Sequence, residues 1–204
     1  TKGSLQLRNI NLRPLGMKSL FNGKDLTGWN EYPDFPTRAT VTPEGFLKLQ
    51  NGNGMIETKE SYDDFNFQTE VNILVPGINS GVFFRCIPGE KMNGYEAQLN
   101  NTINTETGEP ADCGTGGIFR RKDARAIIAK DQEWFFFTIH ADDKHIATWV
   151  NGIQVCDWSD FRDPDPNPRR GLRLEPGTIQ LQGHDETTEV MFRNISAGNI
   201  PPRK

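Results

Sequence analysis

The sequence predicts an all-β fold, a sandwich of two antiparallel sheets, and three observations support this prediction. Between Phe65 and Ile73 apolar and polar residues alternate, which is typical of a strand with one buried face. In Trp149-Val-Asn-Gly-Ile-Gln-Val155, the Asn-Gly pair separates two apolar segments and indicates a β-hairpin with a type I′ turn. The chain contains 20 Gly and 13 Pro, a composition that favours turns over long helices. Its 204 residues are enough for one such domain, since sandwiches run to roughly 200–250 residues.

Charge and hydropathy argue against two classes of partner. The net charge is -4, so we expect no basic surface for DNA or RNA, and hence no nucleic-acid partner. No apolar run approaches the roughly 18 residues of a transmembrane helix, so we expect no membrane insertion. The cysteines Cys86, Cys113 and Cys156 have no zinc-site spacing, and their odd number leaves at least one unpaired. Cys86 and Cys113 could form a disulfide, but buried or loop thiols are favoured.

The first 17 residues are predicted to lie outside the compact domain. Residues 5–12 (LQLRNINL) resemble residues 190–197 (VMFRNISA) near the other end of the chain. We interpret Arg8-Asn9-Ile10 as the closing strand of a preceding β domain, to which residues 18–204 are tethered. Alternatively, both copies are terminal strands of one sandwich, because chain ends often lie close together.

Two further apolar runs, residues 133–140 and 144–158, are expected to form strands. Trp134 and Trp149 lie in these runs, so we expect both to fill the core. Helical signals are weak, and only single turns are predicted, at Thr58–Tyr62 and Ala124–Lys130.

Two segments, residues 100–117 and 161–177, are predicted to be long loops. Loops of this length in a compact domain commonly wrap over a binding site. The alternative is a disordered surface excursion without function.

Three strand-like segments carry polar side chains of the kinds that bind and transform sugars. Side chains alternate along a strand, so polar residues two positions apart share one face. The members are Glu96, Gln98 and Asn100 on the first segment, Gln182, His184 and Asp185 on the second, and Asn79 and Arg85 on the third. A single Gln or Glu on a strand commonly faces solvent, but three such strands together favour a site. Amides hydrogen-bond sugar hydroxyls, while Arg, Glu and His supply charge and proton transfer.

At these residues the sequence resembles the 3-keto-disaccharide hydrolase domain family. The matching motifs follow one another from about residue 18 to residue 200: Ser19-Leu-Phe-Asn-Gly-Lys-Asp-Leu-Thr-Gly-Trp29, Asn79-Ser-Gly-Val-Phe-Phe-Arg85, Gly94-Tyr-Glu-Ala-Gln98, Thr115-Gly-Gly-Ile118, Trp149-Val-Asn-Gly152, Ile179-Gln-Leu-Gln-Gly-His-Asp185 and Phe192-Arg-Asn-Ile195. The resemblance implies a concanavalin-A-like jelly roll with a concave sheet that holds a carbohydrate substrate. It also implies a bacterial, extracytoplasmic (periplasmic or secreted) protein.

The chemistry implied by the resemblance suits a strand with one carboxylate. Ordinary glycosidases flank the bond with two carboxylates, as in the Glu-x-Asp-x-x-Glu strand of laminarinase-type glucanases, whereas this strand offers Glu96 alone. In a 3-keto sugar the carbonyl acidifies the C2 proton, so one base can start an elimination that hydration completes. We expect Glu96 and His184 to act as base and acid, with Arg85 facing the enolate oxygen.

The remaining candidates are expected to bind substrate rather than to react with it. Gln98 and Gln182 would orient hydroxyls, with Asn79 and Asn100 beside them. Asp185 would fix the tautomer of His184 or bind a divalent cation; no cofactor is required and no metal ligand set is predicted. A non-catalytic carbohydrate-binding module of laminin-G or lectin type is the main alternative, and a protein-binding adhesion domain with an exposed apolar patch is a third.

Overall fold

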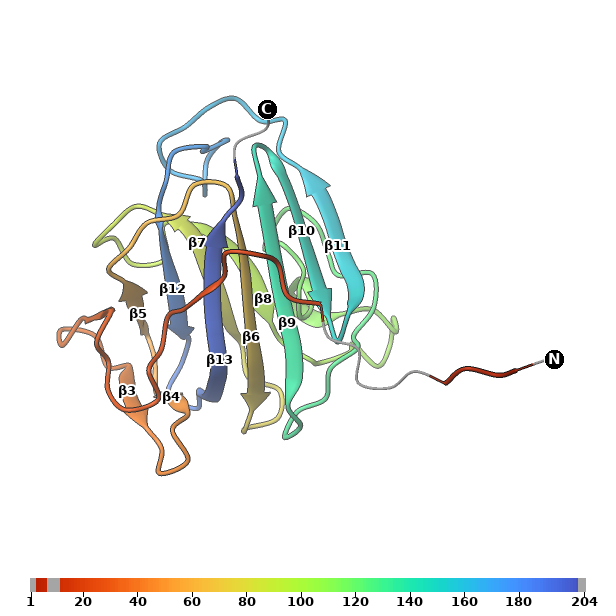
Figure 1. Cartoon of the computed structure of the whole chain (residues 1–204), viewed down its shortest axis with the longest axis horizontal. Helices are drawn as coiled ribbons and strands as arrows, with labels where there is room; N and C mark the ends of the chain where they lie inside the picture. Colours follow the sequence, from red (N-terminus) through yellow and green to blue (C-terminus); the bar gives the residue numbers. More distant parts are fainter. Residues whose placement is uncertain (1–2, 7–11, 202–204) are drawn as a thin grey trace.

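The computed structural model describes residues 3–6 and 12–201, and it confirms a sandwich of two antiparallel sheets (Figure 1). The large sheet runs in the order β11 (Ile153–Ser159), β10 (His145–Val150), β9 (Phe135–Asp142), β6 (Phe65–Ile73), β13 (Glu189–Asn199), β4 (Leu47–Gln50) and β3 (Arg38–Val41), with β1 (Lys18–Ser19) paired to β13. The small sheet runs in the order β2 (Trp29–Glu31), β5 (Gly54–Thr58), β12 (Thr178–Gly183), β7 (Ser80–Cys86) and β8 (Tyr95–Leu99).

The core lies between the two sheets and is built by the alternation that the sequence predicts. Phe65, Phe67 and Val71 of β6 are fully buried, and so are Val82 and Phe84 of β7 in the opposite sheet. Alternate residues of each strand therefore meet in the interior, and the residues between them form the two outer faces.

The predicted hairpin is confirmed, and the predicted helical turns are wrong. Asn151 and Gly152 have φ of 50° and 79° between β10 and β11, as a type I′ turn requires. Thr58–Tyr62 begins with the last residue of β5, and Ala124–Lys130 contains no helical turn. Residues 100–117 are irregular except for isolated bridges and the 3₁₀ turn η1 (Ala111–Cys113).

The tryptophans differ from the prediction. Trp29 is buried and donates from Nε1 to the carbonyl of Leu20 at 2.8 Å. Trp134 and Trp149 are only half-buried, because Phe135 takes the core position next to Trp134, and Trp149 pairs with Thr138 on the outer face of the large sheet.

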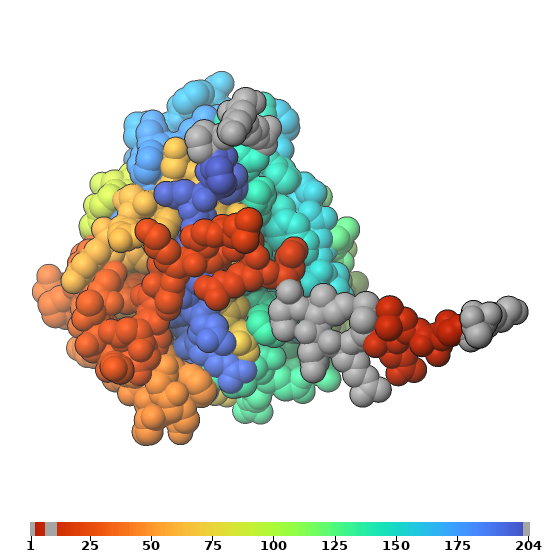
Figure 2. Space-filling view, in the orientation of Figure 1, coloured from red at the N-terminus to blue at the C-terminus, as the bar shows by residue number. Residues whose placement is uncertain are grey.

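Residues 12–20 run across the outer face of the large sheet (Figure 2). Gln68 Nε2 donates to the carbonyl of Leu12 at 3.2 Å, and Leu20 N donates to Ile195 O at 2.9 Å. Arg8-Asn9-Ile10, which we interpreted as the strand of another domain, lies outside the described residues.

All three cysteines are buried free thiols, as favoured above. Within residues 3–6 and 12–201, no helix is long and apolar enough to cross a membrane.

Candidate functional site

The outer face of the small sheet carries a row of two glutamines with a glycine between them. Gly81 of β7 pairs with Gln98 of β8, and the register of β12 against β7 places Gln182 on the other side of Gly81. Neighbouring strands lie about 4.8 Å apart, so a patch of bare backbone separates the two amide side chains. From the sequence, Gly81 was identified only as a member of the Asn79–Arg85 motif, and this role could not be recognised.

Glu96 fills the space above that glycine. A Cβ added to Gly81 would lie 2.8 Å from Glu96 Oε1 and 3.0 Å from its Cγ. Glu96 itself pairs with Phe83, one row along the sheet, and is only 4% exposed. The absence of a side chain at Gly81 is therefore what allows the Glu96 carboxyl to lie against the sheet.

Arg169, from the loop between β11 and β12, is the cation that meets Glu96. Its Nη2 lies 2.9 Å from Glu96 Oε2, and its guanidinium lies 4.9 Å from the ring centre of Phe83 and 5.4 Å from that of Phe119. Its Nε donates to the carbonyl of Met92 at 3.1 Å. The long loop thus reaches the predicted site, but its contribution could not be identified from the sequence.

The environment of Glu96 alters its acidity. Burial raises the pKa of Glu96 above its ordinary value of 4.5, the positive charges of Arg169 and His184 oppose this shift, and Asp112 adds to it. A carboxyl with a raised pKa is better matched to accepting a proton near neutral pH.

Two buried amide oxygens beside Glu96 have no hydrogen bond to any residue that the structure describes. They are Gln98 Oε1 and Gln182 Oε1, on side chains that are 0% and 4% exposed. Buried amide oxygens are almost always hydrogen-bonded, so both are suited to accept from a bound molecule. Gln182 Nε2 contacts Met92 Sδ at 3.3 Å.

A chain of hydrogen bonds determines which end of the Gln98 amide remains open. Asp112 Oδ2 accepts from Nδ2 of Asn79 at 3.3 Å and from Nδ2 of Asn100 at 3.5 Å, and Asn79 Oδ1 accepts from Gln98 Nε2 at 2.8 Å. An ionised carboxylate can only accept, so the amide of Asn79 must present its oxygen to Gln98. The atom of Gln98 that is left over is consequently an acceptor.

Asp112 is a second carboxylate near Glu96 that sequence analysis missed. It comes from η1 and holds a left-handed backbone, with φ and ψ of 45°. Non-glycine residues seldom adopt this conformation, and they do so disproportionately at functional sites.

His184 and Asp185 lie just beyond the end of β12. His184 Nδ1 is 3.2 Å from Asp185 Oδ2, and both side chains are 44% exposed. Burial alone would raise the pKa of Asp185, but hydrogen bonds from Thr187 and His184 outweigh it, so the pKa lies below its usual value. Asp185 is therefore a carboxylate that can hold the His184 ring by Nδ1–H.

Arg85 does not lie at this site, which corrects the prediction. Two residues of β7, Phe84 and Arg85, oppose one residue of β12, and Arg85 has φ of 48°. This bulge turns the guanidinium away from the outer face. It donates instead to Asp64 Oδ1 at 2.7 Å and to the carbonyls of Asp63, Asp143 and Arg173.

The site is covered rather than open. Cavities of about 450 and 420 Å³ lie elsewhere, the first beside β13 and the second near Asp64. Over Glu96 the space is taken by Arg169, whose side chain is 29% exposed. Among the residues that the structure describes, no group of three or more His, Cys, Asp and Glu side chains is arranged to hold a metal ion.

Comparison with known proteins places these observations in a family. Residues 16–197 match the sequence profile of the 3-keto-alpha-glucoside-1,2-lyase-like domain. A pantothenate kinase of Brevibacillus brevis is 24% identical over 190 residues, which are 85% of this chain and 58% of that protein. The chain thus spans little more than half the length of that relative.

Solved structures share the fold. A candidate glycosyl hydrolase from Parabacteroides distasonis superposes with a TM-score of 0.74 at 22% identity, over 91% of this chain and 94% of its own. A carbohydrate-binding module from Bacillus subtilis has a TM-score of 0.59 at 15% identity, over 84% and 95% of the two chains. The architecture is the concanavalin-A-like jelly roll found in glucanases and lectins, as the resemblance implied.

Proposed function

The chain belongs to the 3-keto-alpha-glucoside-1,2-lyase-like domain family, and from this membership we propose that it cleaves 3-keto-disaccharides or 3-keto-glucosides by elimination followed by hydration. The observation that carries the proposal is the Glu96 carboxyl, buried on bare backbone between two amide oxygens that accept no hydrogen bond from the described part of the chain. One positioned base and two open acceptors suit a substrate that has one acidic C–H bond and several hydroxyls.

Glu96 acts as the base. It removes the proton from C2, which the neighbouring C3 carbonyl has acidified, and the electron pair of the C–H bond moves onto the C3 oxygen as an enolate. The enolate then collapses, a C1–C2 double bond forms, and the C1–O bond breaks. His184 supplies the proton for the departing oxygen, while Asp185 holds its other ring nitrogen at 3.2 Å. Each proton transfer of this kind contributes roughly 10²- to 10⁴-fold.

Water then adds across the C1–C2 double bond, with the proton returned to C2. The net change is hydrolysis, with no oxidation or reduction, so the route balances without a redox cofactor. Gln98 and Gln182 accept hydrogen bonds from sugar hydroxyls through their open oxygens.

Arg169 takes the part that sequence analysis assigned to Arg85. In the resting site its charge is paired with Glu96 at 2.9 Å. When Glu96 becomes protonated, the negative charge moves to the enolate oxygen, and a partly exposed arginine beside it can swing to follow that charge. Substrate entry requires the same displacement, because Arg169 covers the carboxyl.

The test is to incubate the protein in D₂O with a 3-keto-disaccharide and with its unoxidised parent. We expect release of monosaccharide from the 3-keto substrate alone, with deuterium at C2 of the released 3-keto sugar. A direct displacement at C1 would leave C2 protonated. Binding of both sugars without release of product would overturn the proposal in favour of a binding module.

Two variants assign the roles within that assay. Glu96→Gln should slow both deuterium incorporation and product release by roughly 10²- to 10⁴-fold. His184→Ala should slow product release while the C2 proton still exchanges, because His184 acts on the leaving group. Full activity in both variants would refute the assignment.

A further inference from the structure

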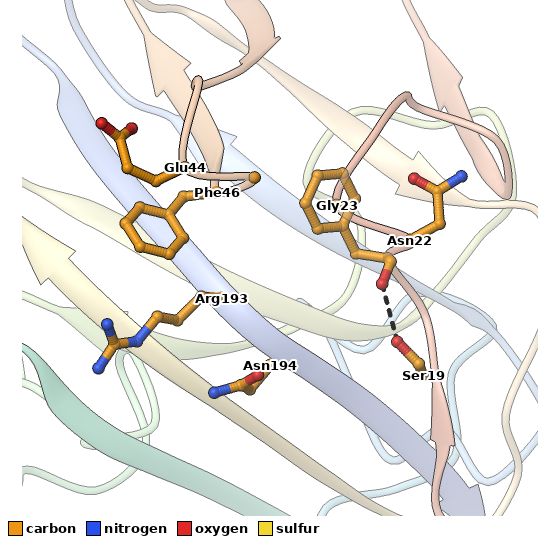
Figure 3. A pocket seen from close by; sticks show the side chains of 9 residues that line it. Ser19, Asn22, Gly23, Glu44, Phe46, Arg193 and Asn194 are labelled. Atoms are coloured by element: carbon orange, nitrogen blue, oxygen red, sulfur yellow. Dashed lines mark hydrogen bonds between the residues drawn. The ribbon is translucent and has the colours of Figure 1, made fainter.

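The larger cavity, of about 450 Å³, lies on the other sheet and takes no part in the function proposed above. Three segments of the chain line it: the end of β1 with the residues that follow, the β3–β4 turn and a bulge in β13 (Figure 3). Its lining residues are Ser19, Phe21, Asn22, Gly23, Glu44, Gly45, Phe46, Arg193 and Asn194. Two motifs of the sequence analysis, Ser19–Trp29 and Phe192–Ile195, contribute to it and have no part in the site at Glu96.

The bulge brings an amide to the floor of this cavity. Asn194 has φ of 54°, and the register of β13 against β6 shifts between Arg193 and Ser196. Bulges commonly re-aim side chains beside functional sites. Asn194 Nδ2 donates to Glu70 Oε1 at 2.6 Å, which leaves Oδ1 without a hydrogen bond among the described residues.

The side walls combine an aromatic ring with two closely packed glycines. Phe46 meets the edge of the Trp134 ring, with centroids 5.1 Å apart. Gly23 and Gly45 lie back to back, since a Cβ on Gly45 would lie 3.1 Å from Gly23 O, and both have positive φ. In Figure 3, Phe46 and Glu44 lie on one side of the opening, with Asn22 on the other.

The charge of Arg193 is already matched, which argues against an anionic ligand. Its Nη2 lies 2.5 Å from Glu70 Oε2, and its guanidinium lies 4.2 Å from the ring centre of Trp134. Glu44 adds an exposed carboxylate at the rim. The open polar atoms are therefore acceptors on Glu44 and Asn194 together with the Nη1 donor of Arg193, next to the exposed part of the Phe46 ring.

We propose that this cavity is a second, non-catalytic binding site for an uncharged saccharide. The sugar places its C–H face on Phe46 and donates hydroxyls to Glu44 and Asn194 Oδ1. Carbohydrates combine an apolar ring face with several hydroxyl donors, and a cavity of about 450 Å³ is in the size range of small-molecule sites. Because the site lies on the opposite sheet from Glu96, a sugar can occupy it while the catalytic face is free.

The experiment is an affinity titration of the full chain by saturation-transfer NMR, with sucrose, trehalose, cellobiose and maltose as probes. We expect at least one of these unoxidised sugars to bind. Phe46→Ala should weaken that binding about tenfold, as loss of an aromatic contact does. Asn194→Gly keeps the left-handed backbone and removes only the amide; it should weaken binding about fivefold. Glu44→Gln should also weaken binding, whereas Glu31→Gln, at an exposed position of β2, is the matched control that should have no effect.

Binding must persist in Glu96→Gln, which separates this proposal from the one above, because that variant tests turnover alone. The inference is overturned if none of the four sugars binds, or if Asn194→Gly and Glu44→Gln both bind like the unaltered chain. It is also overturned if methylammonium or inorganic phosphate binds in place of the sugars, since the cavity would then be an ion site.

Discussion

Glu57 and Glu96 are two buried carboxyl groups on the same outer face of the small sheet, yet their surroundings are opposite. Four groups donate to the Glu57 carboxyl: Tyr32 Oη, Thr178 Oγ1, Gln180 Nε2 and Gly89 N. Within residues 3–6 and 12–201, the Glu96 carboxyl has a single partner, Arg169, and it lies beside two amide oxygens that have none. Glu57 is thus saturated by the protein, while the neighbourhood of Glu96 is left incomplete.

The difference shows how to separate a structural acid from a reactive one when both are buried. Glu57 and Gln180 together hold the turn after β7, because Gly89 N donates to Glu57 and Met92 N donates to Gln180 Oε1 at 2.9 Å. A carboxylate with four donors has no free lone pair for a substrate. Incomplete hydrogen bonding beside Glu96 is instead an opening that a ligand can fill.

The largest expected contrast comes from the same substitution at the two positions. Glu96→Gln should lower kcat/KM for a 3-keto-glucoside by roughly 10²- to 10⁴-fold. It should reduce the free energy of unfolding less than Glu57→Gln does, because its partner Arg169 is partly exposed and can turn toward water. Glu57→Gln should leave the chemistry in place but destabilise the fold by about 1–3 kcal/mol, because the new NH₂ group faces donors. Kinetics and urea denaturation of both variants measure this, and the reverse pattern would contradict the comparison.

A second, smaller effect is expected at the glycine that supports Glu96. In Gly81→Ala the new Cβ would lie 2.8 Å from Glu96 Oε1, so the carboxyl must move by several tenths of an ångström. Displacements approaching 1 Å cost about 10²-fold in rate, so we expect a loss of roughly 10- to 100-fold in kcat.

Combining Gly81→Ala with Glu96→Asp tests whether the loss of kcat arises from displacement of the Glu96 carboxyl. Aspartate is one methylene shorter than glutamate and clears the added methyl group. The losses in kcat of the two single substitutions should therefore not add in the double variant. Strict additivity of the two substitutions in kcat would show that Gly81 does not act through the carboxyl.

The smallest effect on activity is expected from substitution of Arg169, the cation paired with Glu96. Arg169 bridges Met92 O and Glu96 through Nε and Nη2, and lysine cannot make both bonds. Burial raises the pKa of Glu96 and Arg169 opposes it, so Arg169→Lys should raise that pKa further. Glu96 must be ionised to act as a base, so the acidic limb of the pH profile of kcat/KM should move to higher pH. A shift to lower pH would mean that another group sets this limb.

Local alternation along the strands could be predicted from the sequence, and it placed much of the site correctly. Tyr95, Ala97 and Leu99 are buried in the core, while Glu96 and Gln98 lie on the outer face. The period of two in side-chain direction needs no knowledge of the neighbouring strands.

What depends on pairing between distant strands could not be predicted. The place of Gly81 between Gln182 and Gln98 arises only from the register of three strands, and Arg169 reaches Glu96 across 73 positions of sequence. The prediction for Arg85 was wrong for a related reason. One extra residue in β7 reverses the side-chain direction that simple alternation assigns to Arg85.

The hydrogen-bond chain that ends at Gln98 has a consequence for how such a site can evolve. Asp112, in an irregular loop, determines which groups donate and which accept along this chain. The chain passes through Asn79 to the amide of Gln98 on the sheet. Replacing that one carboxylate with a donor would allow both amides to turn over and would present a nitrogen to the ligand. Substrate choice can therefore drift through a loop residue, while the strands and the base at Glu96 are inherited unchanged.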